Sequence, residues 1–233
     1  MLRERLKKFA LKHERLLNVY RSTFGKIKTN LYFGFQSKQL QKNGFSMIEV
    51  INDALTKANA RFFIDCGTLL GIVRNNKLIE YDRDMDFGIW FDESFGPKDL
   101  DRVMQELGFK KVSEGQFHGK IEEMTYGKGV INVDFFNHTE VGDESWLYVF
   151  YRDIERTYPS NKHCSVIIQK RLHISGLKKL TLNGISLNIP ENVEPYLASA
   201  YTENWRIPDP GWQYTMEPGC NYVRDEYGIK ELF

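Results

Sequence analysis

The 233-residue sequence contains only three cysteines, Cys66, Cys164 and Cys220, which lie far apart and form no CxxC pair. Their odd number and wide spacing disfavour a disulfide framework and a zinc ribbon, and favour a reducing compartment. The sequence has no apolar run approaching the roughly 20 residues that a membrane-spanning helix needs. No secretory signal pattern begins at Met1. We therefore expect a cytoplasmic protein.

Three common catalytic motifs are also missing from the sequence. It contains no nucleophile elbow, no Walker phosphate loop, and no GxGxxG at the start of a helix. These absences disfavour a serine hydrolase, a P-loop enzyme and a dinucleotide-binding enzyme. Candidate functional residues must therefore come from other patterns.

The composition predicts a folded protein with a substantial core. Apolar residues make up 42% of the sequence and aromatic residues 14%, and no repeat or low-complexity linker divides it. We predict the α+β (mixed α/β) class, with helices flanking a mixed β-sheet. The expected division is a catalytic domain over residues 43–233, ending in an aromatic-rich tail, and a helical appendage over residues 1–42.

The appendage is strongly basic. Residues 1–42 contain 11 Lys and Arg against 2 Asp and Glu, a net charge of +9, so the rest of the chain carries −8. Apolar positions between residues 2 and 28 recur at near-helical spacing, which predicts one or two amphipathic helices. Such a helix either packs on the domain or on a second copy, or lies on an anionic membrane surface, which would place the protein at the inner face of a membrane. No nucleic-acid-reading motif accompanies the charge, so we expect no nucleic-acid partner.

Local patterns predict the remaining elements. Strands are expected at 62–64, 109–113, 118–126, 130–136 and 146–151, and helices at 46–60, 96–108 and 190–204. Ser46 and Glu49 form a capping-box pattern, which predicts that a helix begins there. Asn183-Gly184 is typical of a hairpin turn. A basic cluster between Lys162 and Lys179, which includes Arg171, is typical of a solvated surface; the alternative is that it faces an anionic substrate.

The most informative stretch runs through residues 62–89 and carries closely spaced acids. Asp84 and Asp86 are separated by one residue, so on a strand both carboxylates point to the same face. Two such carboxylates repel each other, and a bound divalent cation or a shared proton relieves the repulsion. Carboxylates with room for phosphate oxygens favour Mg²⁺, with Mn²⁺ as the alternative, over zinc. Asp82 has the same parity and is a further candidate ligand.

A third acid, Asp134, stands alone in the apolar run 130–136. Burying an unpartnered carboxylate is costly, so we predict that Asp134 joins the same metal centre as a ligand or as a general base. A structural ion pair is the alternative. Gly67-Thr68 follows the first strand and predicts a turn that approaches donor phosphates closely. Arg74 either binds a donor phosphate or holds one of the acids in place.

These motifs resemble a known family. Gly67-Thr68 together with the Asp84/Asp86 pair and the later Asp134 is similar to the nucleotidyltransferase fold. More narrowly, the runs GTLLG (67–71) and DRDMDFGI (82–89), with Arg74 between them, resemble the LicD/fukutin-type phosphotransferases. A weaker resemblance extends to Tyr196-Leu197, Tyr201, Trp205 and Pro208.

The resemblance implies a metal-dependent transferase. The expected reaction moves a phosphocholine or phospho-alditol group from a CDP-activated donor onto a hydroxyl of a cell-surface glycan or a lipid-linked oligosaccharide. One alternative is a nucleotidyltransferase that transfers the nucleotide itself. An alternative of another class is a catalytically silent subunit that binds a glycan or a nucleotide. The tail after Trp205, rich in Pro, Gly and aromatics, either lines a glycan groove or covers the core.

Overall fold

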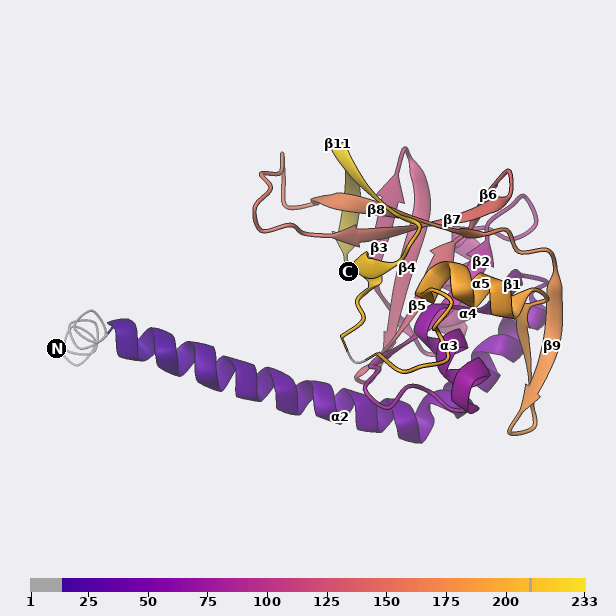
Figure 1. The fold of residues 1–233 in the computed structure, drawn as a ribbon, viewed down its shortest axis with the longest axis horizontal. Coiled ribbons are helices and arrows are strands. Elements are labelled where there is room, and N and C mark those ends of the chain that lie inside the picture. The colour runs from indigo at the N-terminus through magenta and orange to yellow at the C-terminus, as the bar shows by residue number, and fades with distance from the viewer. Residues whose placement is uncertain (1–13, 210) are drawn as a thin grey trace.

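The computed structural model describes residues 14–209 and 211–233 (Figure 1). Its helices are α2 (Glu14–Lys57), α3 (Cys66–Asn75), α4 (Pro97–Glu106), α5 (Val193–Tyr201) and the 3-10 helix η1 (Tyr214–Met216). Its first six strands are β1 (Arg61–Ile64), β2 (Asp84–Trp90), β3 (Lys110–Phe117), β4 (Lys120–Lys128), β5 (Ile131–Asn137) and β6 (Thr139–Val141). The others are β7 (Glu144–Tyr151), β8 (His163–Leu172), β9 (Leu177–Leu182), β10 (Ile185–Pro190) and β11 (Cys220–Leu232).

One large curled sheet is the frame of the molecule. Its nine strands run in the order β1-β2-β5-β4-β3-β11-β8-β7-β6. The β2–β5 pair is parallel, whereas its other neighbouring pairs are antiparallel. Strands β9 and β10 form a separate hairpin. This arrangement of a mixed sheet flanked by helices confirms the predicted α+β class.

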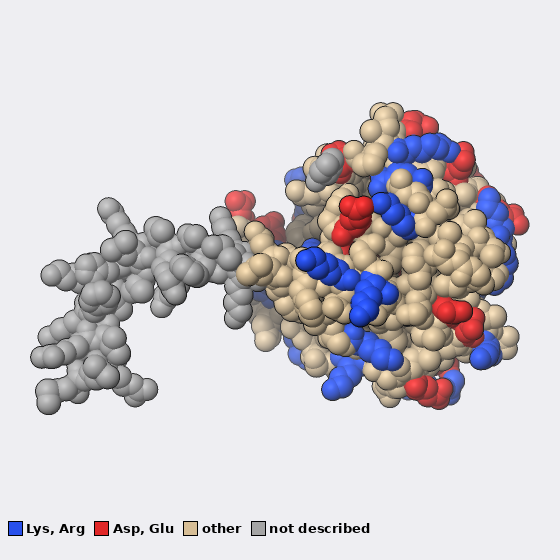
Figure 2. Space-filling view, turned by 90° about the horizontal axis from the view of Figure 1, so that it is seen from below, with Lys and Arg blue, Asp and Glu red and all other residues tan. Residues whose placement is uncertain are grey.

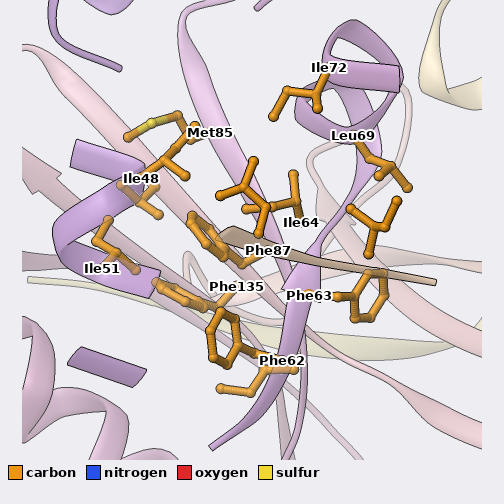
Figure 3. Packing of buried hydrophobic residues seen from close by; sticks show 14 of the residues in the cluster. Ile48, Ile51, Phe62, Phe63, Ile64, Leu69, Ile72, Met85, Phe87 and Phe135 are labelled. Atoms are coloured by element: carbon orange, nitrogen blue, oxygen red, sulfur yellow. The ribbon is translucent and has the colours of Figure 1, made fainter. Parts of the chain in front are cut away.

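The main core lies between α2 and the strands β1, β2 and β5 (Figure 3). Ile48 and Ile51 of α2 are fully buried, as are Phe87 and Phe135 on the facing side of β2 and β5. The rings of Phe87 and Phe135 stack with their centroids 5.2 Å apart. Because side chains alternate along a strand, this apolar face of β2 and β5 leaves the other face for Asp84, Asp86 and Asp134.

The predicted start of a helix at Ser46 is wrong. Helix α2 continues unbroken from Glu14 to Lys57, so Ser46 lies in its interior and its hydroxyl donates to the carbonyl of Asn43 (2.8 Å). No proline interrupts residues 14–57, and the interior glycines are tolerated at a cost of about 1 kcal/mol each. The N-terminal part of α2 projects away from the sheet (Figure 1). Residues 2–13 of the predicted N-terminal helix lie outside the described residues.

The sequence located most strands but missed three strands of the large sheet, β6, β8 and β11. The strands predicted between residues 109 and 151 are present as β3, β4, β5 and β7. The Asn183-Gly184 hairpin is confirmed, and both residues adopt the positive φ (53° and 81°) of a tight turn. Strands β8 and β11 were not predicted, although β11 pairs with β3 on one side and β8 on the other. None of the helices within the described residues has the length and apolar composition needed to cross a membrane.

Candidate active site

Three of the predicted acids meet on one face of the sheet. Asp86 on β2 is the register partner of Asp134 on β5, and because the two strands are parallel their side chains point the same way. Asp84 lies two residues before Asp86 and therefore shares that face. All three line a cavity of about 890 Å³. The structure thus brings together the three acids that the sequence analysis assigned to one site.

The crowding of these carboxylates shifts their proton affinity. Burial, followed by the charges of Asp84 and Asp134, holds the pKa of Asp86 well above its usual range. Burial and the neighbouring charge of Asp84 raise the pKa of Asp134 to about 7. Burial also raises the pKa of Asp84. Each shift means that a full set of negative charges is unfavourable here unless a cation accompanies it.

Asp82 reaches the same cavity by another route. The sequence pattern placed it on the strand with Asp84, but β2 begins at Asp84 and Asp82 lies in the preceding loop. Burial and the charge of Asp84 raise the pKa of Asp82 to about 7, although Arg74 and Arg83 oppose the shift. Asp82 is therefore a fourth acid at the cavity, carried by a loop rather than by the sheet.

Asp134 has polar neighbours of its own. Its Oδ1 accepts a hydrogen bond from the hydroxyl of Thr125 on β4 (2.5 Å). Glu123, also on β4, lines the cavity and accepts a bond from Lys230 Nζ (2.7 Å). Lys230 lies on β11, and its charge lowers the pKa of Asp134 against the larger effects of burial and of the other acids. The last strand of the chain thus contributes a cation near the acids.

Gly67 and Thr68 occupy the first turn of α3 rather than a separate turn before it, because α3 begins at Cys66. A Cβ atom on Gly67 would lie 2.9 Å from Oδ2 of Asp82 and 3.5 Å from Oδ2 of Asp86, so only glycine fits against the acids without a shift. The buried hydroxyl of Thr68 accepts the backbone N–H of Asp86 (2.9 Å). Thr68 therefore orients the acid strand, and a phosphate role for it stays a prediction.

Arg74 lies in the last turn of α3 and lines the cavity. Its Nε donates to Oδ1 of Asn75 (2.8 Å) and its Nη1 to the carbonyl of Trp205 (3.5 Å). Its charge also lowers the pKa of Asp82. Both predicted roles, phosphate binding and support of an acid, fit this position.

Sequence reasoning missed a buried ion network in the cavity wall, where Arg171 and Glu217 are both lining residues. Arg171 of β8, assigned to a basic surface cluster, is 3% exposed and contacts two fully buried carboxylates, Asp65 and Glu217. Although burial alone would raise the pKa of Asp65, the Arg171 charge and the His138 hydrogen bond hold it well below its usual range. Asp65 directly follows the apolar strand β1 and lies two residues before Gly67, so the cost of burying it alone was a signal available in the sequence.

The aromatic tail forms part of the cavity wall. Trp205, Trp212, Tyr214 and Met216 all line the same cavity as the acids that β2 and β5 carry. The ring centroids of Tyr201 and Trp212 lie 4.6 Å apart. Of the two alternatives for the tail, lining a cavity and covering the core, the structure shows elements of both, because Trp205 also packs in the main core.

The donor set suits a metal ion that shares its ligands with a substrate. Within the described ranges, no three His, Cys, Asp or Glu side chains form a complete metal-binding group. Asp84, Asp86 and Asp134 nevertheless offer carboxylate oxygens in one cavity, at a point where their own charges disfavour ionisation. Mg²⁺ is commonly held by one or two carboxylates together with substrate phosphates and water. The residues present therefore fit Mg²⁺ as a partner of a phosphate-bearing substrate.

A model of the LicD/FKTN/FKRP nucleotidyltransferase domain matches residues 59–192. The matched region contains the three acids of β2 and β5, Asp82, and the α3 residues that line the cavity. The chain belongs to the LicD/FKTN/FKRP family. The match begins after α2 and ends before α5.

Two curated relatives carry the name "Ribitol-5-phosphate transferase FKTN". The Macaca fascicularis protein is 21% identical over 189 residues, covering 78% of this chain and 37% of its own length. The Mus musculus protein is 24% identical over 184 residues, covering 76% of this chain and 36% of its own length. An uncharacterised Rickettsia typhi protein is 32% identical over 73 residues, covering 30% of this chain and 24% of its own length. The chain thus spans less than two-fifths of the length of these relatives.

Proposed function

We propose that this protein is a Mg²⁺-dependent transferase that moves a phospho-alditol or phosphocholine group from a CDP-activated donor onto a glycan hydroxyl. The observation that carries the proposal is the register pairing of Asp86 with Asp134 beside Asp84, on a cavity wall where Gly67 leaves room for the carboxylates of Asp82 and Asp86. The name of the fukutin relatives, ribitol-5-phosphate transferase, favours an alditol phosphate, ribitol 5-phosphate, as the transferred group.

Each site residue has a role that follows from its position. Asp84 and Asp86 would hold Mg²⁺, with Asp134 and Asp82 as further oxygen donors. Bound Mg²⁺ would neutralise the donor diphosphate and stabilise the charge that develops on the leaving group. The N-terminus of α3 at Gly67 and the Arg74 guanidinium would bind phosphate oxygens, since both carry positive charge toward the cavity.

The transfer itself is a substitution at phosphorus. The oxygen of the acceptor hydroxyl forms a bond to the alditol-bearing phosphorus, and the bond from that phosphorus to the CMP oxygen breaks. In this step Asp134 acts as the general base, and the hydroxyl proton passes to its carboxylate. CMP leaves with the electron pair of the broken bond, and the product is a phosphodiester.

Two other functions use the same residues differently. A nucleotidyltransferase would move the NMP and release pyrophosphate or a phosphate ester, and analysis of which half of the donor reaches the acceptor separates the two. A silent binding subunit would have no need for the mutually repelling acids, whose burial disfavours their charged forms. Calorimetry that detected no divalent cation in the presence of nucleotide would favour that subunit.

The deciding experiment compares ligands by thermal unfolding. A ligand that binds only the folded state raises the unfolding temperature according to its occupancy. We expect Mg²⁺ with CDP or CTP to stabilise the protein more than Mg²⁺ with ADP, ATP or UTP, and we expect Asp84→Asn to remove the difference. A preference for ATP would favour nucleotidyl transfer, and no nucleotide effect at all would contradict an enzyme with a nucleotide donor.

We also propose that α2 contacts an anionic membrane surface that carries a lipid-linked acceptor. Three apolar side chains on this helix are exposed: Leu31 is 71% exposed, and Tyr32 and Phe35 are 49% exposed each. All three lie within residues 1–42, which carry a net charge of +9. Basic residues with exposed aromatics are typical of helices that lie in a membrane interface. Figure 2 shows further Lys and Arg side chains on the face seen from below, near the point where α2 leaves the body.

The membrane proposal is tested with vesicles containing phosphatidylserine. Full-length protein should co-sediment with them at low salt, and replacing Leu31 and Phe35 by serine should weaken binding. Equal binding of the double variant, or equal binding to neutral vesicles, would contradict the proposal. The charge argues against the alternative of a paired helix from a second copy, because two such helices would place their like charges together.

A further inference from the structure

Arg171 is a buried guanidinium that joins four parts of the molecule. From β8, its Nη1 donates to both carboxylate oxygens of Asp65 (3.1 Å each) and to the hydroxyl of Tyr196 on α5 (3.1 Å). Its Nε and Nη2 donate to the two oxygens of Glu217 (2.8 and 3.1 Å). Its Nη2 also donates to Oε1 of Gln169 (3.2 Å). Because a guanidinium is planar and its donors have fixed directions, such contacts constrain all four partners together.

The first connection leads to the acids. Asp65 immediately precedes α3, and the next two residues, Cys66 and Gly67, line the cavity. Cys66 has a φ of +45°, a left-handed conformation that is strained for a residue other than glycine. Such strain persists only where surrounding contacts over-determine the backbone. The Arg171–Asp65 contact, together with the approach of Arg171 to Sγ of Cys66 (3.5 Å), supplies that constraint.

The second connection leads to the segment between α5 and β11, which also lines the cavity. The tail wall, defined as residues 202–209 and 211–217, connects α5 to β11 and is largely exposed on its outer side. Glu217 at its end is 3% exposed and bound by Arg171. The amide of Gln169, whose oxygen Arg171 binds, donates through Nε2 to the carbonyl of Tyr214 (3.1 Å). Arg171 therefore holds the tail wall directly and through Gln169.

A catalytic triad is the obvious alternative use of this network, and the structure excludes it. Ser145, His138 and Asp65 form a hydrogen-bonded series with distances of 2.9 and 3.0 Å. All three residues are at most 3% exposed, and neither Ser145 nor His138 lines the cavity. A nucleophile without access to a substrate cannot act, so the series only fixes Asp65 from the side opposite Arg171.

We propose that Arg171 is a positioning residue that fixes the tail wall against the first turn of α3, through Glu217 on one side and Asp65 on the other. It thereby sets the spacing across the cavity between the acids and Trp212, Tyr214 and Met216. The proposal that this spacing serves group transfer rests on the proposed function. A buried ion pair is poor evidence for stability by itself, whereas it is well suited to selecting one arrangement of the groups it joins.

Limited proteolysis tests the positioning role without any substrate. Arg206 is exposed in the tail wall, but the neighbouring Trp205 is buried, so we expect trypsin to cut after Arg206 mainly when this segment opens. Cleavage then follows the population of the open form. Glu217→Gln removes the charge that holds the tail wall, so we expect cleavage after Arg206 to be faster by about tenfold at a temperature where the variant remains folded. Glu231→Gln, which breaks the exposed Lys162–Glu231 pair on β11, is the matched control and should leave the cleavage rate unchanged.

The kinetic test separates the two connections. With CDP-ribitol as donor, CMP release is measured for each variant, with water or an added glycan as acceptor. Glu217→Gln should raise KM by about tenfold with kcat within about twofold, because it loosens a wall that binds ground state and transition state alike. Arg171→Lys loosens both sides and should lower kcat as well. A residue that only stabilised the fold would shift the unfolding temperature and leave KM unchanged.

The outcomes are distinguishable from those of the proposed function. If wild-type protein releases no CMP from any CDP donor, the proposed function fails, and proteolysis still decides the positioning role. Cleavage after Arg206 at the wild-type rate in Glu217→Gln would overturn the proposal. Where Glu217→Gln does not fold, Glu217→Asp keeps the charge but shortens the reach to Arg171, and the same local opening is expected; its absence would likewise overturn the proposal.

Discussion

Asp86 and Asp134 are register partners on the parallel strands β2 and β5, and both carboxylates face the cavity while Phe87 and Phe135, the next residues on each strand, stack in the core. One apolar contact therefore fixes the separation of two like charges. Because the stacked pair cannot move without opening the core, the acids stay close even where their repulsion raises their pKa values.

The first prediction concerns the central acid. Asp86→Asn should reduce turnover at least about 10³-fold, since it removes a carboxylate charge that would hold Mg²⁺ against the donor diphosphate. The unfolding temperature without divalent cation should not fall, because burial and the neighbouring carboxylates already disfavour the charged form of Asp86. Asp53→Asn, on an exposed position of α2, is the control and should retain full activity. Turnover within tenfold of wild type would remove Asp86 from the mechanism.

The second prediction concerns pH. The pKa of Asp134 rises from its ordinary value of 3.8 to about 7 on folding, so between these values the folded state binds more protons than the unfolded state. The free energy of unfolding in the absence of divalent cation should therefore fall as pH rises from about 4 to 7, and level off above the folded pKa. Unfolding curves measured in chelator across this range give the slope.

Mg²⁺ should reverse part of this pH dependence. Metal ligands must be deprotonated, so the stabilisation by Mg²⁺ plus CDP should be larger at pH 8 than at pH 5.5. Asp134→Asn should reduce the slope of the profile measured in chelator, leaving the part that Asp82, Asp84 and Asp86 contribute, and Asp53→Asn should leave it as in wild type. A wild-type stability that rises between pH 5 and 7 in chelator would contradict the raised pKa of Asp134.

The third prediction concerns the contact between α3 and β2. Thr68→Val removes the hydroxyl that accepts the backbone N–H of Asp86 and leaves that buried donor without a partner, at a cost of about 1–3 kcal/mol in the free energy of unfolding. Thr68→Ser keeps the acceptor and should lose much less. Chemical denaturation of the two variants measures the difference, and equal losses would show that the methyl group, not the hydroxyl, matters.

Much of the site was predictable because its signals are local. Alternation along residues 84–90 separates acids from apolar side chains, and a lone carboxylate in an apolar run identified Asp134. Because burying an isolated carboxylate is costly, such residues are expected to share one polar centre. This expectation needs no knowledge of the strand order. The register that pairs Asp134 with Asp86 depends on a crossover between β2 and β5, and no local pattern contains it.

The parts that the sequence did not predict depend on contacts between distant segments. Arg171 stands in a run of basic residues, and such a run is typical of a surface. In the folded chain, however, its charge is compensated in the interior by Asp65 and Glu217, which lie far from it in the sequence on either side. Strand β11 is rich in charged residues because one stretch of it is exposed, which hid its pairing with β3 and β8. Ser46 shows the opposite error, where a local capping pattern occurs inside a continuous helix, between the buried residues Leu40 and Ile48.

The last prediction concerns the space beside the acids. In Gly67→Ala the new Cβ would lie 2.9 Å from Oδ2 of Asp82, so that carboxylate must move away from Gly67. We expect the affinity for Mg²⁺ plus CDP, measured by calorimetry, to fall by about tenfold or more, a loss of about 1.4 kcal/mol. The unfolding temperature should change little, because the carboxylate belongs to a loop. Gly34→Ala is the matched control: nothing lies within 4 Å of its Cβ position on α2, so nucleotide affinity should be unchanged. Wild-type affinity in Gly67→Ala would show that the phosphate does not approach this turn.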